Sequence, residues 1–454
     1  MSRSPFIAIV LAAGEGTRLN SARPKVLHEI AGQPMICHVL DALRPLQPAE
    51  TVVVIGRDMP DVARAVTPAA TAVQAPPRGT ADAVKAARPA IAGRLAAADI
   101  DAVLVLFGDT PLLRSETIAT LLTARRRAPA AAVAVAGMRP ADPGPYGRLV
   151  QDAEGGAVRI VEAKDASAAE RAIGLCNGGI MAIAARHLFP LLDRIGNDNA
   201  KREFYLTDIV GLARADGLAC RVTELPAAEL LGVNTRAELA EAERLMQDRL
   251  RRRAMAAGAS LVAPETVFFA ADTQLGRDVV IEPHVVFGPG VTVADGVRIR
   301  AFCHIEGADL ATGAIIGPFA RLRPGAVLER DVHVGNFVEV KASRLGAGVK
   351  ASHLSYLGDS DIGAGTNIGA GTITCNYDGF NKFRTIIGDN AFIGSNTALV
   401  APVTVGDGAY VATGSTVTGD VPAGALTIAR ARQVDKPGRA AELRARLNQQ
   451  RKHR

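Results

Sequence analysis

The first segment that could do chemistry is a loop of small residues behind a short apolar run. Residues 11–19 have the sequence Leu-Ala-Ala-Gly-Glu-Gly-Thr-Arg-Leu, and Lys25 follows six residues later. Small residues let backbone N–H groups come close to a polyphosphate, and Arg18 and Lys25 could neutralise its charge. The loop lacks the Walker A pattern, and Leu19 occupies the place of the third glycine of a dinucleotide-binding loop. It therefore predicts a nucleotide site, with an ordinary strand-to-helix turn as the alternative.

A carboxylate behind a second apolar run could hold a divalent cation. Asp109 follows the run Ala102–Phe107 after a single glycine. At the carboxyl end of a parallel strand, such an oxygen is well placed to bind Mg²⁺ beside a ligand. A simple Gly-Asp turn is the alternative.

A further cluster of polar residues could catalyse acyl transfer. It is formed by the segments Arg321–Arg323, Val338–Lys341, Ser352–Tyr356 and Thr374–Tyr377. An imidazole has an ordinary pKa near 6.5 and can take a proton from an amine at neutral pH, which makes His353 a candidate base. Arg323 and Lys341 could clamp a sugar phosphate. For His353 taken alone, an ordinary polar residue is the alternative.

The elements that position the first two groups follow a βαβα order. Apolar runs that predict strands are Ile7–Ala12, Thr51–Ile55, Ala102–Phe107, Ala132–Ala136 and Gly178–Ile183. Segments with helical spacing lie between them, such as Met35–Leu43 and Glu116–Ala124. This order predicts a Rossmann-like α/β domain with a parallel sheet and helices on both faces.

A long helix is predicted over residues 235–257. Thr235 and Glu238 have the spacing of a capping box, and no glycine follows until Gly258. We expect this helix to link two domains.

The C-terminal half has a period of six. Aliphatic or similar residues recur at Ile281, Phe287, Val293, Ile299 and Ile305, at Ile316, Leu322, Leu328, Val334 and Val340, at Ile362 and Ile368, and at Ile387, Ile393, Leu399, Val405, Val411 and Val417. A helix cannot use this period, but stacked short strands can, and hexapeptide periodicity indicates a parallel β-helix. His353 lies in the irregular stretch between Val340 and Ile362, where we expect a loop to leave the stack.

Composition and charge limit the classes of partner. The 454 residues are too many for one core. The net charge is +6, but residues 439–454 carry +5 of it, so the remaining body is nearly neutral and binding to nucleic acid is not expected. The basic tail is predicted to be a flexible, solvated arm. The early apolar run Phe6–Ala13 is too short for a membrane span and lacks the pattern of a signal peptide, so no membrane partner is expected either. Five scattered cysteines without a C-x-x-C motif favour reduced thiols in the cytoplasm.

The motif L-x-x-G-x-G-T-R followed by P-K resembles the sugar-1-phosphate nucleotidyltransferases. With the hexapeptide half, residues 5–435 are similar to the bacterial bifunctional N-acetylglucosamine-1-phosphate uridylyltransferase / glucosamine-1-phosphate acetyltransferase family. The resemblance implies a nucleotidyltransferase domain (1–234), a linker helix (235–257), a left-handed parallel β-helix acetyltransferase domain (258–438) and a basic tail (439–454). It also implies Mg²⁺, UTP and acetyl-CoA as cofactor and co-substrates, a homotrimer formed through the β-helix, and a role in cell-wall and surface-polymer synthesis.

The resemblance also implies roles for residues of the N-terminal half. Arg18 and Lys25 would act on the triphosphate, while Asp109 and Asn234 would hold Mg²⁺. The residues implied to bind UTP or UDP-N-acetylglucosamine are Leu11, Ala12, Ala13, Gly14, Lys25, Gln74, Gly79, Thr80, Gly147, Glu162, Asn177 and Asn234. Among these, Gln74 and the Gly79–Thr80 turn would recognise uracil.

In the C-terminal half, the resemblance implies that His353 is the general base. Glucosamine 1-phosphate would be bound by Arg323, Lys341, Tyr356 and Asn367. Acetyl-CoA would be bound by Ala370, Asn376, Tyr377, Ser395, Thr413 and Arg430.

Four positions depart from the family pattern. The family usually has G-T-G-H-A where this chain has Gly79-Thr-Ala-Asp-Ala83, a change that could alter base or sugar recognition. Phe107 and Thr413 stand where tyrosine and alanine are usual. Two alternatives therefore remain: a single-activity sugar-1-phosphate nucleotidyltransferase with the β-helix as an oligomerisation scaffold, and a non-enzymatic binding protein. A binding protein would not need Asp109, Asn234 and His353, so their presence disfavours the second alternative.

Overall fold

The computed structural model describes residues 5–452 apart from 15, 98 and 145. Glu15 of the small-residue loop and Arg454 of the tail lie outside this range. The chain divides into two compact units, Met1–Arg252 and Arg253–Arg454. Within the described residues, no helix has the length and apolar character needed to cross a bilayer.

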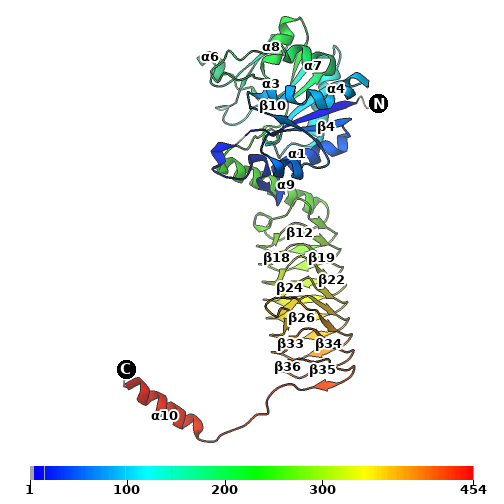
Figure 1. Ribbon diagram of the computed structural model, residues 1–454, viewed down its shortest axis with the longest axis vertical. Coiled ribbons are helices and arrows are strands. Elements are labelled where there is room, and N and C mark those ends of the chain that lie inside the picture. Colours follow the sequence, from blue (N-terminus) through cyan, green and yellow to red (C-terminus); the bar gives the residue numbers. More distant parts are fainter. Residues whose placement is uncertain (1–4, 15, 98, 145, 453–454) are drawn as a thin grey trace. The chain divides into compact units, whose positions relative to one another are not determined.

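The N-terminal unit is built on a nine-stranded sheet (Figure 1). Seven strands form its main path in the order β11-β7-β10-β6-β1-β4-β5. Their bounds are β1 Phe6–Leu11, β4 Glu50–Gly56, β5 Ala70–Gln74, β6 Ala102–Phe107, β7 Val133–Met138, β10 Cys176–Ala184 and β11 Cys220–Glu224. β8 (Arg148–Gln151) and β9 (Ala157–Val161) form a hairpin attached to β10, and β2 (Glu29–Ile30) pairs with β3 (Gln33–Pro34).

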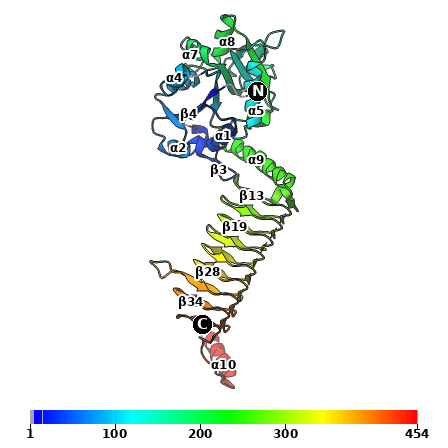
Figure 2. The ribbon, with the colours of Figure 1, turned by 90° about the vertical axis from the view of Figure 1, so that its right-hand side faces the viewer.

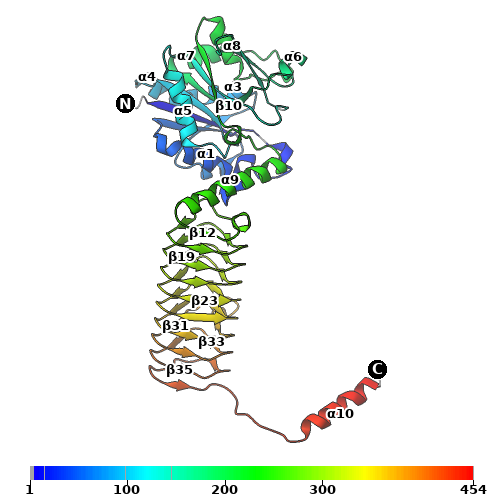
Figure 3. The same cartoon turned by 180° about the vertical axis from the view of Figure 1, so that it is seen from behind.

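Helices cover both faces of this sheet, as predicted (Figure 3). Alternate residues of β1 enter different cores: Ile7 packs with α3, α4, α7 and α8, whereas Ala8 packs with α1, α2 and α5. The helices are α1 Met35–Leu43, α2 Pro60–Ala65, α3 Thr80–Ala86, α4 Arg88–Ala97, α5 Ser115–Arg126, α6 Ala168–Arg171, α7 Ala185–Leu192 and α8 Asp208–Ala215. Because both faces are buried, the strands are continuous apolar runs.

Among the five predicted strands, β10 alone departs from the predicted parallel sheet. β10 runs antiparallel to both β6 and β7. The chain leaves β7 at its carboxyl end and makes the β8–β9 hairpin there, and Cys176 at the start of β10 pairs with Met138 at the end of β7. The beginning of β10, rather than its end, therefore lies at the edge of the sheet where the carboxyl ends of β6 and β7 lie.

The long helix predicted over 235–257 is α9, Arg236–Ala256. Its capping box is confirmed, because the Thr235 hydroxyl accepts from the Glu238 backbone N–H at 3.2 Å and the Glu238 carboxylate accepts from the Thr235 N–H at 2.8 Å.

The C-terminal unit is a left-handed parallel β-helix with three sheets of short strands (Figure 1). Face A holds β12 Ser260–Leu261, β14 Val280–Ile281, β17 Arg298–Ile299, β20 Ile315–Ile316, β23 His333–Asn336, β26 Lys350–His353, β29 Asn367–Ile368, β32 Phe392–Ile393, β35 Tyr410–Val411 and β37 Leu426–Thr427. Face B holds β15 Val286–Phe287, β18 His304–Ile305, β21 Arg321–Leu322, β24 Glu339–Lys341, β27 Tyr356–Gly358, β30 Ile373–Cys375, β33 Ala398–Val400 and β36 Thr416–Val417. Face C holds β13 Gln274–Leu275, β16 Thr292–Val293, β19 Ala308–Leu310, β22 Ala326–Leu328, β25 Arg344–Leu345, β28 Ser360–Ile362, β31 Thr385–Ile387 and β34 Val403–Val405.

The six-residue repeat is confirmed by burial. Every aliphatic or aromatic position of the predicted runs is at most 3% exposed. Equivalent positions of neighbouring coils pair in register, as Ile281 does with Ile299 and Ile299 with Ile316. Each coil therefore buries its inward side chains against the next.

The predicted break of the stack at His353 is wrong. Strand β26 pairs in register with β23 on one side and with β29 on the other. The rhythm changes because the inward position holds the small residue Ala351, and because Val340 and Leu345 are only five residues apart. The loop that does leave the stack comes later, between β30 and β31, and is visible in Figure 2.

The basic tail contains a helix, α10 (Arg439–Lys452), whose residues are exposed, which agrees with the solvated arm that was predicted.

Candidate active sites

Three residues predicted for the triphosphate and metal meet in the N-terminal unit. The Lys25 ammonium donates to the Asp109 carboxylate and to the Asn234 side-chain oxygen, the latter at 3.1 Å. Both side chains of the Lys25–Asp109 pair are about 15% exposed. Two oxygens therefore converge on one cation, which suits a metal ligand set. Among the described residues, no group of three or more His, Cys, Asp or Glu side chains could hold a metal, so a cation here would complete its ligands from substrate or water.

The backbone fixes this trio. Asp109 follows β6, and its carbonyl accepts from the Val233 N–H at 2.9 Å, which holds the segment with Asn234 against it. The Asn234 N–H donates to Glu238 of α9 at 2.7 Å. Gly16 packs on the stem of Lys25, where an added Cβ would lie 2.5 Å from the Lys25 Cβ. The small-residue loop and Lys25 are therefore in direct contact.

The residues predicted to recognise uracil also meet. Gln74 ends β5, and its side-chain nitrogen donates to the Gly79 carbonyl at 3.0 Å and to the Asp82 carboxylate at 2.9 Å. Gly79 has φ +119° and lies against the backbone of Phe204, which leaves no room for a side chain. Gln74 and Ala13 line a cavity of about 450 Å³.

The predicted amino-sugar residues form a third group. The Asn177 N–H donates to the Gly147 carbonyl at 2.8 Å, and an added Cβ on Gly147 would lie 3.6 Å from a Glu162 oxygen. Burial raises the pKa of Glu162 above its ordinary value, while the Thr207 hydroxyl opposes this by donating to the carboxylate at 3.1 Å. Burial raises the pKa of Tyr205 to about 12.

The segment 204–207 connects the second and third groups. The Ala81 N–H donates to the Phe204 carbonyl, the Leu206 N–H donates to the Thr80 hydroxyl, and Thr207 reaches Glu162. The remaining predicted residues of this unit differ in exposure. Leu11, Ala12 and Ala13 are buried at the end of β1, whereas Gly14 and Arg18 are exposed.

In the C-terminal unit, His353 has an orienting partner. Its Nδ1 lies 2.8 Å from the side-chain oxygen of Asn336, its register partner on the preceding coil. Because an amide oxygen only accepts, this contact places the proton on Nδ1 and leaves Nε2 able to act as a base.

The predicted phosphate clamps lie nearby on face B, and each is paired with a carboxylate. Arg323 donates to Glu339 at 2.9 Å, and Lys341 lies 3.2 Å from Asp359. Asp359 also accepts from Asn376. The Tyr356 hydroxyl lies 3.4 Å from the same Asn376 amide nitrogen.

Four predicted residues form a column below Asn336. On face A, successive coils pair in register at Ala351, Ile368, Ile393 and Val411. Two residues after each of these positions comes a predicted residue, in the order His353, Ala370, Ser395 and Thr413. Arg430 lies near this column, since an added Cβ on Gly414 would be 3.6 Å from its side chain. Asn367 lies on face A between Lys350 and Phe392, and Tyr377 is exposed in the loop after β30.

Sequence reasoning assigned no role to Asn336, Glu339 or Asp359. They could have been identified by searching one coil before or after each predicted residue. Each lies 16 to 18 residues from a predicted residue: Asn336 from His353, Glu339 from Arg323, and Asp359 from Lys341.

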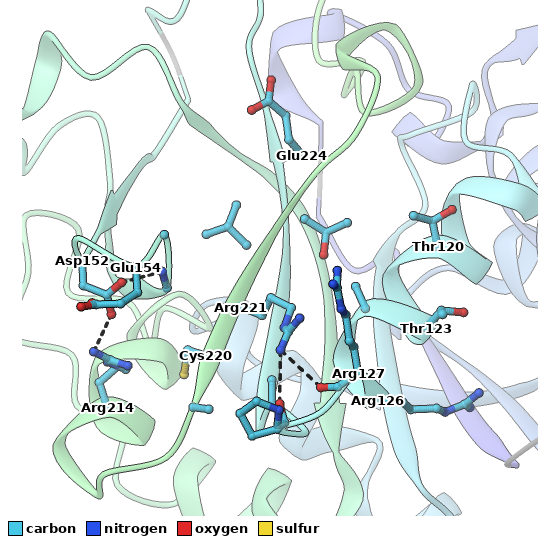
Figure 4. A pocket seen from close by; sticks show the side chains of 18 of the residues that line it. Thr120, Thr123, Arg126, Arg127, Asp152, Glu154, Arg214, Cys220, Arg221 and Glu224 are labelled. Atoms are coloured by element: carbon cyan, nitrogen blue, oxygen red, sulfur yellow. Dashed lines mark hydrogen bonds and ion pairs between the residues drawn. The ribbon is translucent and has the colours of Figure 1, made fainter.

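A larger cavity, about 1500 Å³, lies elsewhere in the N-terminal unit and contains none of the predicted residues (Figure 4). Arg127 and Arg221 line it beside β11, and Asp152 pairs with Arg214 at its other side.

Comparison with known proteins accounts for both units. The family model for the MobA-like NTP transferase domain matches residues 8–210, and the bacterial transferase hexapeptide model (six repeats) matches residues 272–307 and 384–419. A relative from Paramagnetospirillum magneticum, called bifunctional protein GlmU, is 54% identical over 98% of both chains. A relative of the same name from Xanthobacter autotrophicus is 57% identical over 98% of both chains. Another from Acidiphilium cryptum is 58% identical over 96% of this chain and 98% of its own. The chain therefore belongs to the family of bifunctional GlmU proteins.

Proposed function

We propose how the two units of this bifunctional enzyme divide the synthesis of UDP-N-acetylglucosamine. The C-terminal unit transfers an acetyl group from acetyl-CoA to glucosamine 1-phosphate. The N-terminal unit then transfers uridylate from UTP to the N-acetylglucosamine 1-phosphate and releases pyrophosphate. Similarity over nearly the whole chain favours this function over the single-activity alternative.

For acetyl transfer, the observation that carries the proposal is the contact of His353 with Asn336. With Nδ1 engaged, Nε2 of His353 takes the proton as the substrate amine attacks the thioester carbonyl, and the carbon–sulfur bond breaks to release CoA. Arg323 and Lys341 hold the sugar phosphate, and Tyr356 and Asn367 orient the sugar. The column formed by Ala370, Ser395 and Thr413, with Asn376, Tyr377 and Arg430, binds acetyl-CoA.

For uridylyl transfer, a phosphate oxygen of the sugar attacks the α-phosphorus of UTP in line, and the bond to pyrophosphate breaks. Such chemistry needs alignment and charge neutralisation more than a covalent nucleophile. Arg18 and Lys25 neutralise the polyphosphate held by the loop from Leu11 to Gly14. Asp109 and Asn234 would hold Mg²⁺, which would add positive charge beside the phosphates when bound.

The remaining contacts give selectivity. Gln74, Gly79 and Thr80 recognise the base. Gly147, Glu162 and Asn177 bind the amino sugar.

The proposal places the two activities in residues 1–234 and 258–438, joined by the helix at 235–257. We propose a homotrimer assembled through the β-helix. An exposed stack of aromatic rings supports it: His284, Phe302, Phe319 and Phe337 stack at 4.8 to 5.2 Å between centroids and leave apolar surface for a neighbour to cover. We also propose a cytoplasmic location, which suits the five free cysteines, and a role in supplying cell-wall and surface-polymer synthesis.

One incubation tests the order of the two steps. The purified chain is mixed with glucosamine 1-phosphate, acetyl-CoA, UTP and Mg²⁺, and products are identified by mass spectrometry. UDP-N-acetylglucosamine is expected. His353→Asn should leave glucosamine 1-phosphate unreacted, whereas Asp109→Asn should accumulate N-acetylglucosamine 1-phosphate. If both variants accumulate the same compound, the assignment of the two activities to the two units is wrong.

A further inference from the structure

The amide of Gln74 is held in one orientation. Its nitrogen donates one hydrogen to the Gly79 carbonyl at 3.0 Å and the other to the Asp82 carboxylate at 2.9 Å. Reversing the amide would place its oxygen against two acceptors, which is unfavourable, so the positions of O and N are set by the surroundings. The side chain is only 5% exposed, so water cannot easily replace these partners.

This orientation leaves Gln74 with one kind of polar contact to offer. Both of its N–H groups are used, and among the described residues its oxygen Oε1 has no hydrogen-bond partner. Gln74 lines the cavity of about 450 Å³ together with Ala13 and Pro77. A base bound there by Oε1 must present an N–H group.

Uracil and cytosine differ at ring atom N3, the position that would face Oε1 of Gln74. In uracil, N3 carries a hydrogen and is the sole donor on the pairing edge, whereas in cytosine N3 is an acceptor. A cytosine bound in the same pose would set two acceptors against each other and leave a buried group unsatisfied. Sites built on such pairing reject the wrong partner much more strongly than sites built on shape alone.

We propose that Asp82 is a positioning residue that sets the preference for UTP over CTP by fixing the Gln74 amide. The inference rests on the proposed function, in which Gln74 faces the base. Asp82 is one of two residues in this segment, with Ala81, that depart from the family pattern, and histidine is usual at its position. Its side chain is 15% exposed, and its other oxygen accepts from Arg78 at 3.1 Å. A carboxylate is an acceptor only, so it cannot support the reversed amide.

The test compares nucleotides on the full-length chain. Initial rates of pyrophosphate release are measured with N-acetylglucosamine 1-phosphate and either UTP or CTP, and the ratio of the two kcat/KM values is the readout. Asp82→Leu removes the acceptor and should lower the UTP/CTP ratio about 10- to 100-fold, mainly by raising the rate with CTP. Asp82→Asn keeps an acceptor but adds a donor, so its UTP/CTP ratio should lie between those of the wild-type chain and Asp82→Leu.

The matched control is Arg78→Ala. It removes the ion pair to the other oxygen of Asp82 and leaves the contact with Gln74, so the ratio should not change. Acetyl transfer by each variant, and a circular dichroism spectrum, report whether the chain is folded.

The outcomes separate two failures. If the wild-type chain has the same kcat/KM with CTP as with UTP, or does not use UTP, the proposed function of the base pocket fails. If the wild-type chain prefers UTP and Asp82→Leu lowers both rates equally, the pocket stands but Asp82 has only a structural role. If Arg78→Ala changes the ratio as much as Asp82→Leu, the ion pair and not the amide contact determines it, which also overturns the inference.

Discussion

Replacing Asn336 should weaken acetyl transfer through its effect on His353. The Asn336→Ala substitution removes the acceptor 2.8 Å from the imidazole Nδ1. A hydrogen bond of this kind contributes about 0.5–1.5 kcal/mol, which corresponds to a loss of about 2- to 13-fold in kcat/KM. His353 is exposed, so water can take the vacated place, and the lower part of this range is expected. Deleting the base by His353→Asn should cost far more, about 10²- to 10⁴-fold.

The assay measures CoA and N-acetylglucosamine 1-phosphate by liquid chromatography in single and double variants. Because Asn336 acts through His353, adding Asn336→Ala to His353→Asn should cost almost nothing further. Uridylyl transfer from UTP to supplied N-acetylglucosamine 1-phosphate serves as a control within the same molecule and should stay unchanged. The reasoning fails if Asn336→Ala has the same effect with and without His353, or if both activities fall together.

Three further predictions concern the loop, the sugar site and the stack. Gly16→Ala should abolish uridylyl transfer and spare acetyl transfer, because its φ of +65° is strained for alanine and the new Cβ would lie 2.5 Å from the Lys25 Cβ; separate assays of the two steps check this. Burial raises the pKa of Glu162, so the folded chain holds that proton more tightly than the unfolded chain, and the resulting stability is present at low pH and lost as pH rises through the raised pKa. Melting temperatures of Glu162→Gln relative to wild type should therefore rise between about pH 4 and pH 8, and a flat difference would contradict it. Leu328→Ala should destabilise the β-helix by about 2–5 kcal/mol, whereas Val327→Ala on the same strand should cost little, because Leu328 is 1% exposed and Val327 38%; calorimetric unfolding compares them.

The fold of the C-terminal unit was predictable at the level of single residues because one physical rule repeats. Each coil must bury the same position against its neighbour, so the pattern of Ile299, Ile316 and Val334 is visible without any knowledge of the structure. The location of the protruding loop was not predictable from rhythm alone. A small inward residue such as Ala351 and a true departure from the stack both interrupt a count of large aliphatic residues.

The direction of β10 was hidden for a similar reason. A strand buried on both faces has the same apolar composition whether it runs parallel or antiparallel, and only the path through the β8–β9 hairpin decides it. This reversal has a consequence for the site. It brings Asn177 at the start of the strand to the edge where Gly147 lies, so the error in topology concerned the element whose Asn177 we propose binds the amino sugar.

The pairing of Lys25 with Asp109 was hidden because a contact between elements far apart in the sequence leaves no local pattern, whereas the carboxylate partners of Arg323 and Lys341 lie about one coil away. Lys25 is 84 residues from Asp109 and Lys341 is 18 from Asp359. These two cations are therefore neutralised by carboxylates, as Arg323 is by Glu339. Burying a cation without a partner would be costly, so the carboxylates stabilise the cations in these positions.

The same pairing requires an exchange when substrate arrives. A phosphate that takes Lys25 leaves Asp109 and Asn234 with two oxygens facing the space that the ammonium had filled. Asp109 and Asn234 would then be free to hold a cation, which would supply positive charge beside the polyphosphate when bound. The proposed Mg²⁺ site is thus coupled to nucleotide binding by Lys25. Mn²⁺, which can be followed by paramagnetic resonance, should bind to the wild-type chain at least about tenfold more tightly with UTP than without it, and Lys25→Met should remove most of that difference. Equal Mn²⁺ affinity with and without UTP in the wild-type chain would show that the ammonium does not compete for these oxygens.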